Sequence, residues 1–96
     1  MRVLLQAHLD TAKANEVVRS GKMPQVMQEI MEAFKPEASY FGPDQGVRTM
    51  FLVFDMQDTS QMPPITEQLF QAFGAEVNYT PVMNLEDLQK GLSQLK

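Results

Sequence analysis

The chain has 96 residues, of which 44% are hydrophobic and 21% are charged, and these values are typical of a globular protein. Twelve acidic and eight scattered basic residues give a net charge of -4, so the sequence lacks the basic patch with which proteins bind nucleic acid or anionic membranes. It also lacks cysteine, which excludes disulfides, thiolate nucleophiles and cysteine-ligated metals.

The length of the chain predicts one domain with one hydrophobic core over residues 1–96. The longest apolar run, residues 50–54, is far shorter than the roughly 20 residues that span a bilayer. The first residues become polar too early for the apolar core of a signal peptide. We therefore expect a cytoplasmic protein with no membrane partner.

The first third of the chain predicts a strand and a broken helix. Residues 2–9 alternate between two faces with the period of two that a half-buried strand shows. Helix-forming residues follow from Thr11 to Ser20, but Gly21 and Pro24 interrupt them. Because proline suits the first turn of a helix, a second helical piece is expected to begin at Pro24. This piece has an apolar stripe along one side and is expected to end at Pro36.

The middle of the chain predicts a β-hairpin. Residues 37–42 favour a second strand, and residues 42–46 have the glycine, proline and aspartate of a hairpin loop. Residues 47–56 give a third strand that is apolar on both faces. This pattern is typical of a strand that is buried on both sides.

The last third predicts a helix, a strand and a final short helix. The pair Pro63–Pro64 suits a helix start, and Gly74 is well placed to end that helix. Residues 75–83 alternate as a fourth strand, in which Pro81 indicates a sheet edge or a strand end. Asn84 can cap the final helix. Leucines recur along one side of this helix, at Leu85, Leu88, Leu92 and Leu95.

The order of these elements predicts an α+β fold of the ferredoxin-like βαββαβ type. A four-stranded antiparallel sheet would carry the helices on one face, with an extra helix at the C-terminus. The opposite face of the sheet would expose the second apolar side of the third strand, and a large bare apolar patch is uncommon on a monomer. The simplest cover is the same face of a second copy, so we expect a homodimer.

Two segments, residues 35–41 and 80–88, resemble the dimeric α/β-barrel superfamily, and in particular its short uncharacterised bacterial members. The resemblance covers most of residues 2–92. It implies two sheets that face each other and enclose a pocket in each subunit. Members of this superfamily include cofactor-free monooxygenases, isomerases, haem-degrading enzymes and ligand-sensing modules, so the fold leaves the function open. The haem-degrading branch relies on a tryptophan, which this chain lacks.

Five residues are candidates for a site. His8, the single histidine, and Gln6 share a strand face opposite the predicted helices. An imidazole there can act as a general base or bind a ligand, or it can simply bond to water or backbone at a strand end. Tyr40 and Tyr79 can orient a ligand through their hydroxyls, and Arg48 can pair with a carboxylate. The alternatives are ordinary strand aromatics and a solvated arginine beside the hairpin.

No metal-binding pattern, phosphate-binding glycine loop or nucleophile motif occurs in the sequence, so we expect neither metal nor cofactor. The eight methionines either fill the core or line an adaptable pocket. Two functions remain open. One is a protein that binds a small apolar or aromatic ligand between its sheets; the other is a cofactor-independent monooxygenase or isomerase with His8 as base. A third possibility is an accessory subunit of a larger partner, which C-terminal leucines that are exposed in the free dimer would favour.

Overall fold

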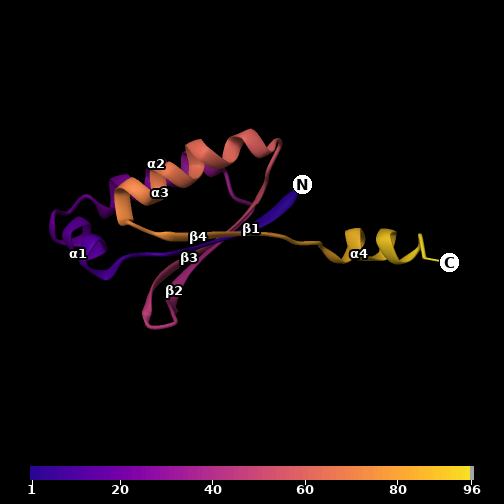
Figure 1. The fold of residues 1–96 in the computed structure, drawn as a ribbon, viewed down its shortest axis with the longest axis horizontal. Helices are drawn as coiled ribbons and strands as arrows, with labels where there is room; N and C mark the ends of the chain where they lie inside the picture. The colour runs from indigo at the N-terminus through magenta and orange to yellow at the C-terminus, as the bar shows by residue number, and fades with distance from the viewer. Residues whose placement is uncertain (96) are drawn as a thin grey trace.

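The computed structural model describes residues 1–95 and confirms the predicted order of elements (Figure 1). Within these residues the strands are β1 (Arg2–His8), β2 (Ala38–Asp44), β3 (Val47–Asp55) and β4 (Glu76–Pro81). The helices are α1 (Thr11–Arg19), α2 (Met23–Phe34), α3 (Met62–Phe73) and α4 (Leu85–Leu92), with a 3₁₀ turn at Thr59–Gln61. The strands pair antiparallel in the order β2-β3-β1-β4. The α+β, ferredoxin-like fold is therefore confirmed.

Local sequence signals explain where the helices begin and end. The side chain of Asp10 caps α1 by accepting a hydrogen bond of 3.0 Å from the backbone N–H of Lys13. Gly21 separates α1 from α2 with φ at 75°, and α2 has its proline in the first turn. Gly74 ends α3 with φ at 56°, a conformation that glycine adopts without steric cost.

The hairpin between β2 and β3 is tighter than the predicted loop over residues 42–46. Its turn is formed by Gln45 and Gly46, which both have positive φ, at 53° and 81°. Two such residues in succession match the twist of the strands that they join. Strand β2 therefore extends to Asp44, and it keeps Pro43 because an edge strand can leave one side of its backbone unpaired.

The core lies between the sheet and the layer formed by α1, α2 and α3 (Figure 1). Alternate residues of the two central strands point into it, together with apolar side chains of the helices. They include Val3, Leu5, Ala7, Ile30, Phe34, Met50, Leu52, Phe54, Leu69 and Phe73. On the other side of β3, Phe51 and Val53 are only half-buried in the single chain. Strand β3 was predicted to be buried on both sides. In the single chain its burial is complete only on the helix side.

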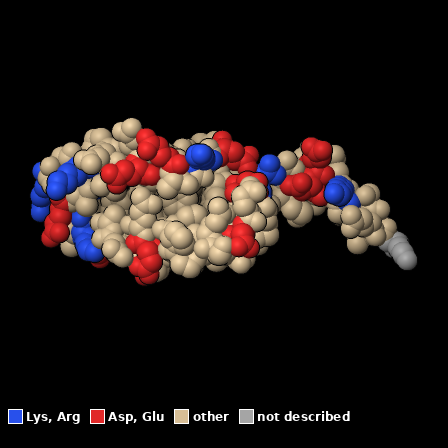
Figure 2. All heavy atoms as spheres, turned by 90° about the horizontal axis from the view of Figure 1, so that it is seen from above, with Lys and Arg blue, Asp and Glu red and all other residues tan. Residues whose placement is uncertain are grey.

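Helix α4 projects beyond the end of the sheet, away from the helix layer (Figure 1). Seen from the helix side in Figure 2, it forms a narrow extension of the body, and the molecule is 56 Å long and 18 Å thick. The leucines of this segment are exposed, as expected of a helix without a packing surface: Leu85, Leu88 and Leu92 in α4, and Leu95 beyond it. No helix among residues 1–95 is long and apolar enough to cross a membrane.

Candidate functional site

The sheet face opposite the helices, which we call the open face, carries three central rows of side chains between an outer row of Arg2 and Asp55 at the α4 end and a row of Asp44 and Val47 at the hairpin. Of the three central rows, the one nearest α4 contains Ala38, Val53, Leu4 and Thr80; the middle row contains Tyr40, Phe51, Gln6 and Asn78; the third row contains Gly42, Thr49, His8 and Glu76. Residues directly opposite each other in paired strands point to the same face. The three central rows are therefore mainly apolar near α4 and polar near the hairpin.

His8 is paired with an aspartate at the polar end of the open face. Its Nε2 lies 2.8 Å from Oδ2 of Asp44, and the side chains are 12% and 41% exposed, respectively. When Nε2 donates its proton to this carboxylate, Nδ1 remains free to accept a proton or a hydrogen bond. Asp44 falls within the predicted hairpin loop and was not among the candidate residues, although its even spacing from Ala38, Tyr40 and Gly42 places it on the same face.

The middle row combines aromatic and amide side chains. Tyr40 is opposite Phe51 on β3, Phe51 is opposite Gln6 on β1, and Gln6 is opposite Asn78 on β4. The ring of Tyr40 is well exposed, whereas Phe51 and Gln6 are half-buried. Aromatic rings bind flat apolar groups, and amides donate and accept hydrogen bonds, so this row presents both kinds of contact on one surface.

The other two candidate residues lie away from the open face. Tyr79 is opposite Leu5 and points to the helix side, where its hydroxyl lies 2.7 Å from the hydroxyl of Thr66 on α3. Burial raises the pKa of the Tyr79 phenol above its usual value. Arg48 is opposite Pro43 and lies at the hairpin end of the helix side. The structure thus brings together Gln6, His8 and Tyr40, and separates Tyr79 and Arg48 from them.

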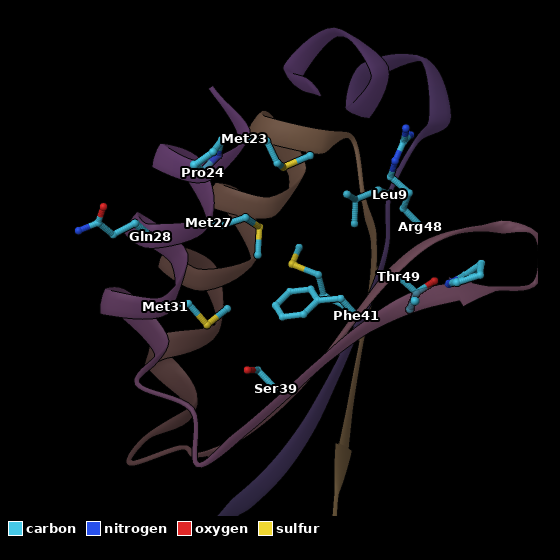
Figure 3. Close-up of a pocket in the computed structure, with 13 residues that line it drawn as sticks. Leu9, Met23, Pro24, Met27, Gln28, Met31, Ser39, Phe41, Arg48 and Thr49 are labelled. Atoms are coloured by element: carbon cyan, nitrogen blue, oxygen red, sulfur yellow. The ribbon is translucent and has the colours of Figure 1, made fainter. Parts of the chain in front are cut away.

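A groove lies on the helix side between α2 and the β2–β3 hairpin and has a volume of about 750 Å³. We call it the α2 groove. Met23, Met27 and Met31 form its α2 wall, and Phe41 and Met50 come from the hairpin strands. Figure 3 shows Met27 and Met31 pointing from α2 toward the ring of Phe41. Some of the methionines therefore line an adaptable apolar surface, while others, such as the buried Met50, also belong to the core.

The whole chain, residues 1–96, matches the model of a family described as a domain of unknown function, DUF3303. The chain belongs to this family. A search of the curated proteins gave no match.

Solved structures resemble the fold of this DUF3303 domain. The uncharacterized protein TM1266 from Thermotoga maritima is 19% identical, with a TM-score of 0.52 over 85% of this chain and 95% of that one. A formyltetrahydrofolate deformylase from Pseudomonas putida KT2440 is 12% identical, with a TM-score of 0.50 over 84% of this chain but 28% of the enzyme. An uncharacterized NIPSNAP domain protein from Burkholderia xenovorans is 13% identical, with a TM-score of 0.43 over 88% of this chain and 97% of that one. At such identities the first two likenesses show the fold alone.

A cluster of ion pairs connects α4 of the DUF3303 domain to its sheet. Nε of Arg2 lies 2.5 Å from Oε1 of Glu37, and Nη1 of Arg2 lies 2.9 Å from Oδ2 of Asp87 in the first turn of α4. The hydrogen bond with Glu37 raises the pKa of Arg2. Asp87 also completes a capping box with Asn84. Because its charges are mutually paired and exposed, this cluster orients α4 and offers little free charge to a ligand.

Proposed function

We propose that this DUF3303 domain acts as a homodimer that binds a small, flat aromatic molecule between the open faces of its two subunits. The observation that carries this proposal is the middle row, where the rings of Tyr40 and Phe51 adjoin the amide of Gln6. A pocket of this kind needs apolar walls and a few fixed polar groups. The rings supply the walls, and the amides of the row supply hydrogen bonds for the edge of the ligand.

The apolar part of the open face supports the proposal of a dimer. Leu4, Phe51 and Val53 are only half-buried and adjoin one another on the central strands. Contiguous apolar surface of this kind is usually covered in soluble proteins. A two-fold axis would bring each open face against its equivalent and cover both at once.

The His8–Asp44 pair favours ligands with a polar substituent. Both residues lie at the polar end of the open face, with His8 one row from Tyr40 and Gln6 and Asp44 two rows from them. With Nε2 held by Asp44, Nδ1 of His8 can bind a phenolic hydroxyl, and a protonated His8 can bind a carboxylate. The preferred class is therefore phenols and aromatic carboxylic acids.

The binding proposal is tested with a panel of phenols and aromatic carboxylic acids, screened by thermal shift and then titrated by calorimetry. We expect Tyr40→Ala to weaken the binding of a hit about tenfold, because stacking and ring burial contribute about 1.4 kcal/mol.

Phe70→Ala is the control for this titration. Phe70 is 42% exposed on α3, on the helix side of the sheet, and lines neither the open face nor the α2 groove. We expect Phe70→Ala to leave the affinity unchanged. A panel without hits, or an equal loss of affinity in both variants, would contradict binding at the open face.

A second candidate function is cofactor-independent isomerisation, and the His8–Asp44 contact of 2.8 Å favours it. Nδ1 of His8 would take a proton from a carbon beside a carbonyl group and return it to a neighbouring carbon, so the reaction needs no co-reactant. The Asp44 carboxylate would stabilise the imidazolium that forms in between. A monooxygenase would use the same proton abstraction, with molecular oxygen as the second substrate.

The catalytic alternative is tested by incubating each ligand of the panel with the protein in D₂O and following proton exchange by NMR. We expect His8→Ala to abolish exchange and Asp44→Asn to slow it at least about 100-fold. Tyr79→Phe, on the helix side, is the control that should exchange at the wild-type rate. Exchange that survives in His8→Ala would exclude His8 as the base.

A further inference from the structure

Two apolar surfaces of this chain have no partner among residues 1–95: the α2 groove and a C-terminal leucine stripe, formed by Leu85, Leu88 and Leu92 of α4 and by Leu95 beyond the helix. We infer that the two belong together, with α4 of each subunit seated in the α2 groove of a second copy. This inference rests on the homodimer of the proposed function and adds to it a contact outside the open faces.

The groove and the stripe match in length and in chemistry. Met23, Met27 and Met31 recur every four residues, so they form one line along α2 that is about 12 Å long at 1.5 Å per residue. Helix α4, Leu85–Leu92, has eight residues and therefore the same length of about 12 Å. An amphipathic helix with leucines three and four residues apart is the usual occupant of an apolar groove. The flexible thioethers can adapt to the leucine side chains.

The chain cannot place α4 in its own groove. The ion pair between Arg2 and Asp87 holds the first turn of α4 at the start of β1, whereas Leu9 and Arg48 line the groove near the other end of β1. The seven residues of β1 separate these ends by about 20 Å. Residues 82–84, which link β4 to α4, span at most about 10 Å. Figures 1 and 2 show α4 directed away from the body.

Charges near the two surfaces are complementary. Glu86 lies in the first turn of α4, and Lys90 lies in its last turn. At the groove, Arg48 lines one end, while Glu32 is held by a hydrogen bond of 3.2 Å from Gln28, which also lines the groove. If α4 runs parallel to α2, Glu86 approaches Arg48 and Lys90 approaches Glu32, so both rims pair opposite charges.

A second copy of the chain is the occupant that uses both surfaces fully. In a two-fold dimer each α4 enters the α2 groove of the other subunit, so both helices and both grooves are paired. The open face alone offers sixteen residues per subunit, fewer than the roughly 20–30 residues of a stable interface. The four leucines and the groove residues bring the total to at least that size.

The test uses two single-cysteine variants, which is possible because the natural chain has no cysteine. Leu88→Cys chains are mixed with affinity-tagged Met27→Cys chains and treated with a short bismaleimide. We expect a covalent product with one chain of each kind, which cannot arise within one chain. In the control mixture Met27→Cys is replaced by Val18→Cys, an exposed position on α1, and we expect no mixed product above background.

Sedimentation of Leu88→Glu is the second measurement, and it separates this inference from the proposed function. We expect Leu88→Glu to remain folded, because Leu88 is exposed in the single chain, and to raise the dimer dissociation constant at least about tenfold. If the wild-type protein is a dimer but no mixed product forms, or the same amount forms with Val18→Cys, the exchange of α4 is overturned and the proposed dimer is not. A monomeric wild-type protein would overturn both.

Discussion

We expect Phe51→Glu to dissociate the homodimer into monomers. Phe51 lies in the middle row of the open face, directly between Tyr40 and Gln6. A carboxylate at this position would be buried against the facing sheet without a partner for its charge. A cost of about 3 kcal/mol or more raises the dissociation constant at least about 100-fold. Sedimentation velocity at micromolar concentration should then show the mass of one chain, 10.9 kDa.

Phe70→Glu is the matched control for this measurement. Phe70 is 42% exposed on α3, on the helix side of the sheet, so the same substitution adds the same charge away from the open face. We expect the Phe70→Glu protein to sediment as the wild-type dimer. If both variants remain dimers, the interface lies elsewhere and the cavity between the open faces does not exist.

Leu52→Ala, by contrast, should greatly lower the free energy of unfolding. Leu52 follows Phe51 on β3 but points into the core, where it is fully buried. Truncating a buried leucine to alanine removes apolar contacts and leaves a cavity, which costs about 2–5 kcal/mol. A domain of this size has a free energy of unfolding of only about 5–15 kcal/mol. Urea unfolding at a fixed protein concentration measures the loss.

Met83→Ala is the control for the unfolding experiment. Met83 lies between β4 and α4 and is 64% exposed, so removing its side chain should change the free energy of unfolding by less than about 0.5 kcal/mol. A similar loss in both variants would mean that the core is not centred on the helix side of β3. A fixed concentration matters because dimerisation contributes to the apparent stability.

Most of the fold could be predicted from the sequence because its signals are local. The alternation in residues 2–9 identified the two faces of β1, and Gly21 with Pro24 located the break between α1 and α2. Pro81 marked the end of an edge strand, as the structure shows. Each of these signals depends on residues that are close in the sequence, so no tertiary information is needed to interpret it.

The site depended on contacts that local patterns do not contain. His8 and Asp44 are 36 residues apart, and they meet because a two-residue turn extends β2 farther than its composition indicated. The alternation of β4 separated Tyr79 from Asn78, but only the register with β1 shows that Tyr79 faces the helices. The α2 groove arises from the way α2 packs beside the hairpin, and the methionine spacing alone fits a core equally well.

The arginine at the start of β1 connects α4 to the sheet through an ion pair. The direction of α4 depends on an ion pair between Arg2 and Asp87, and both side chains are partly open to solvent. Dissolved salt screens charges that are exposed to water, so an exposed ion pair of this kind contributes less at high ionic strength. It has little influence on the apolar packing beneath the sheet. We therefore expect high ionic strength to weaken the attachment of α4 to the sheet more than it weakens the core.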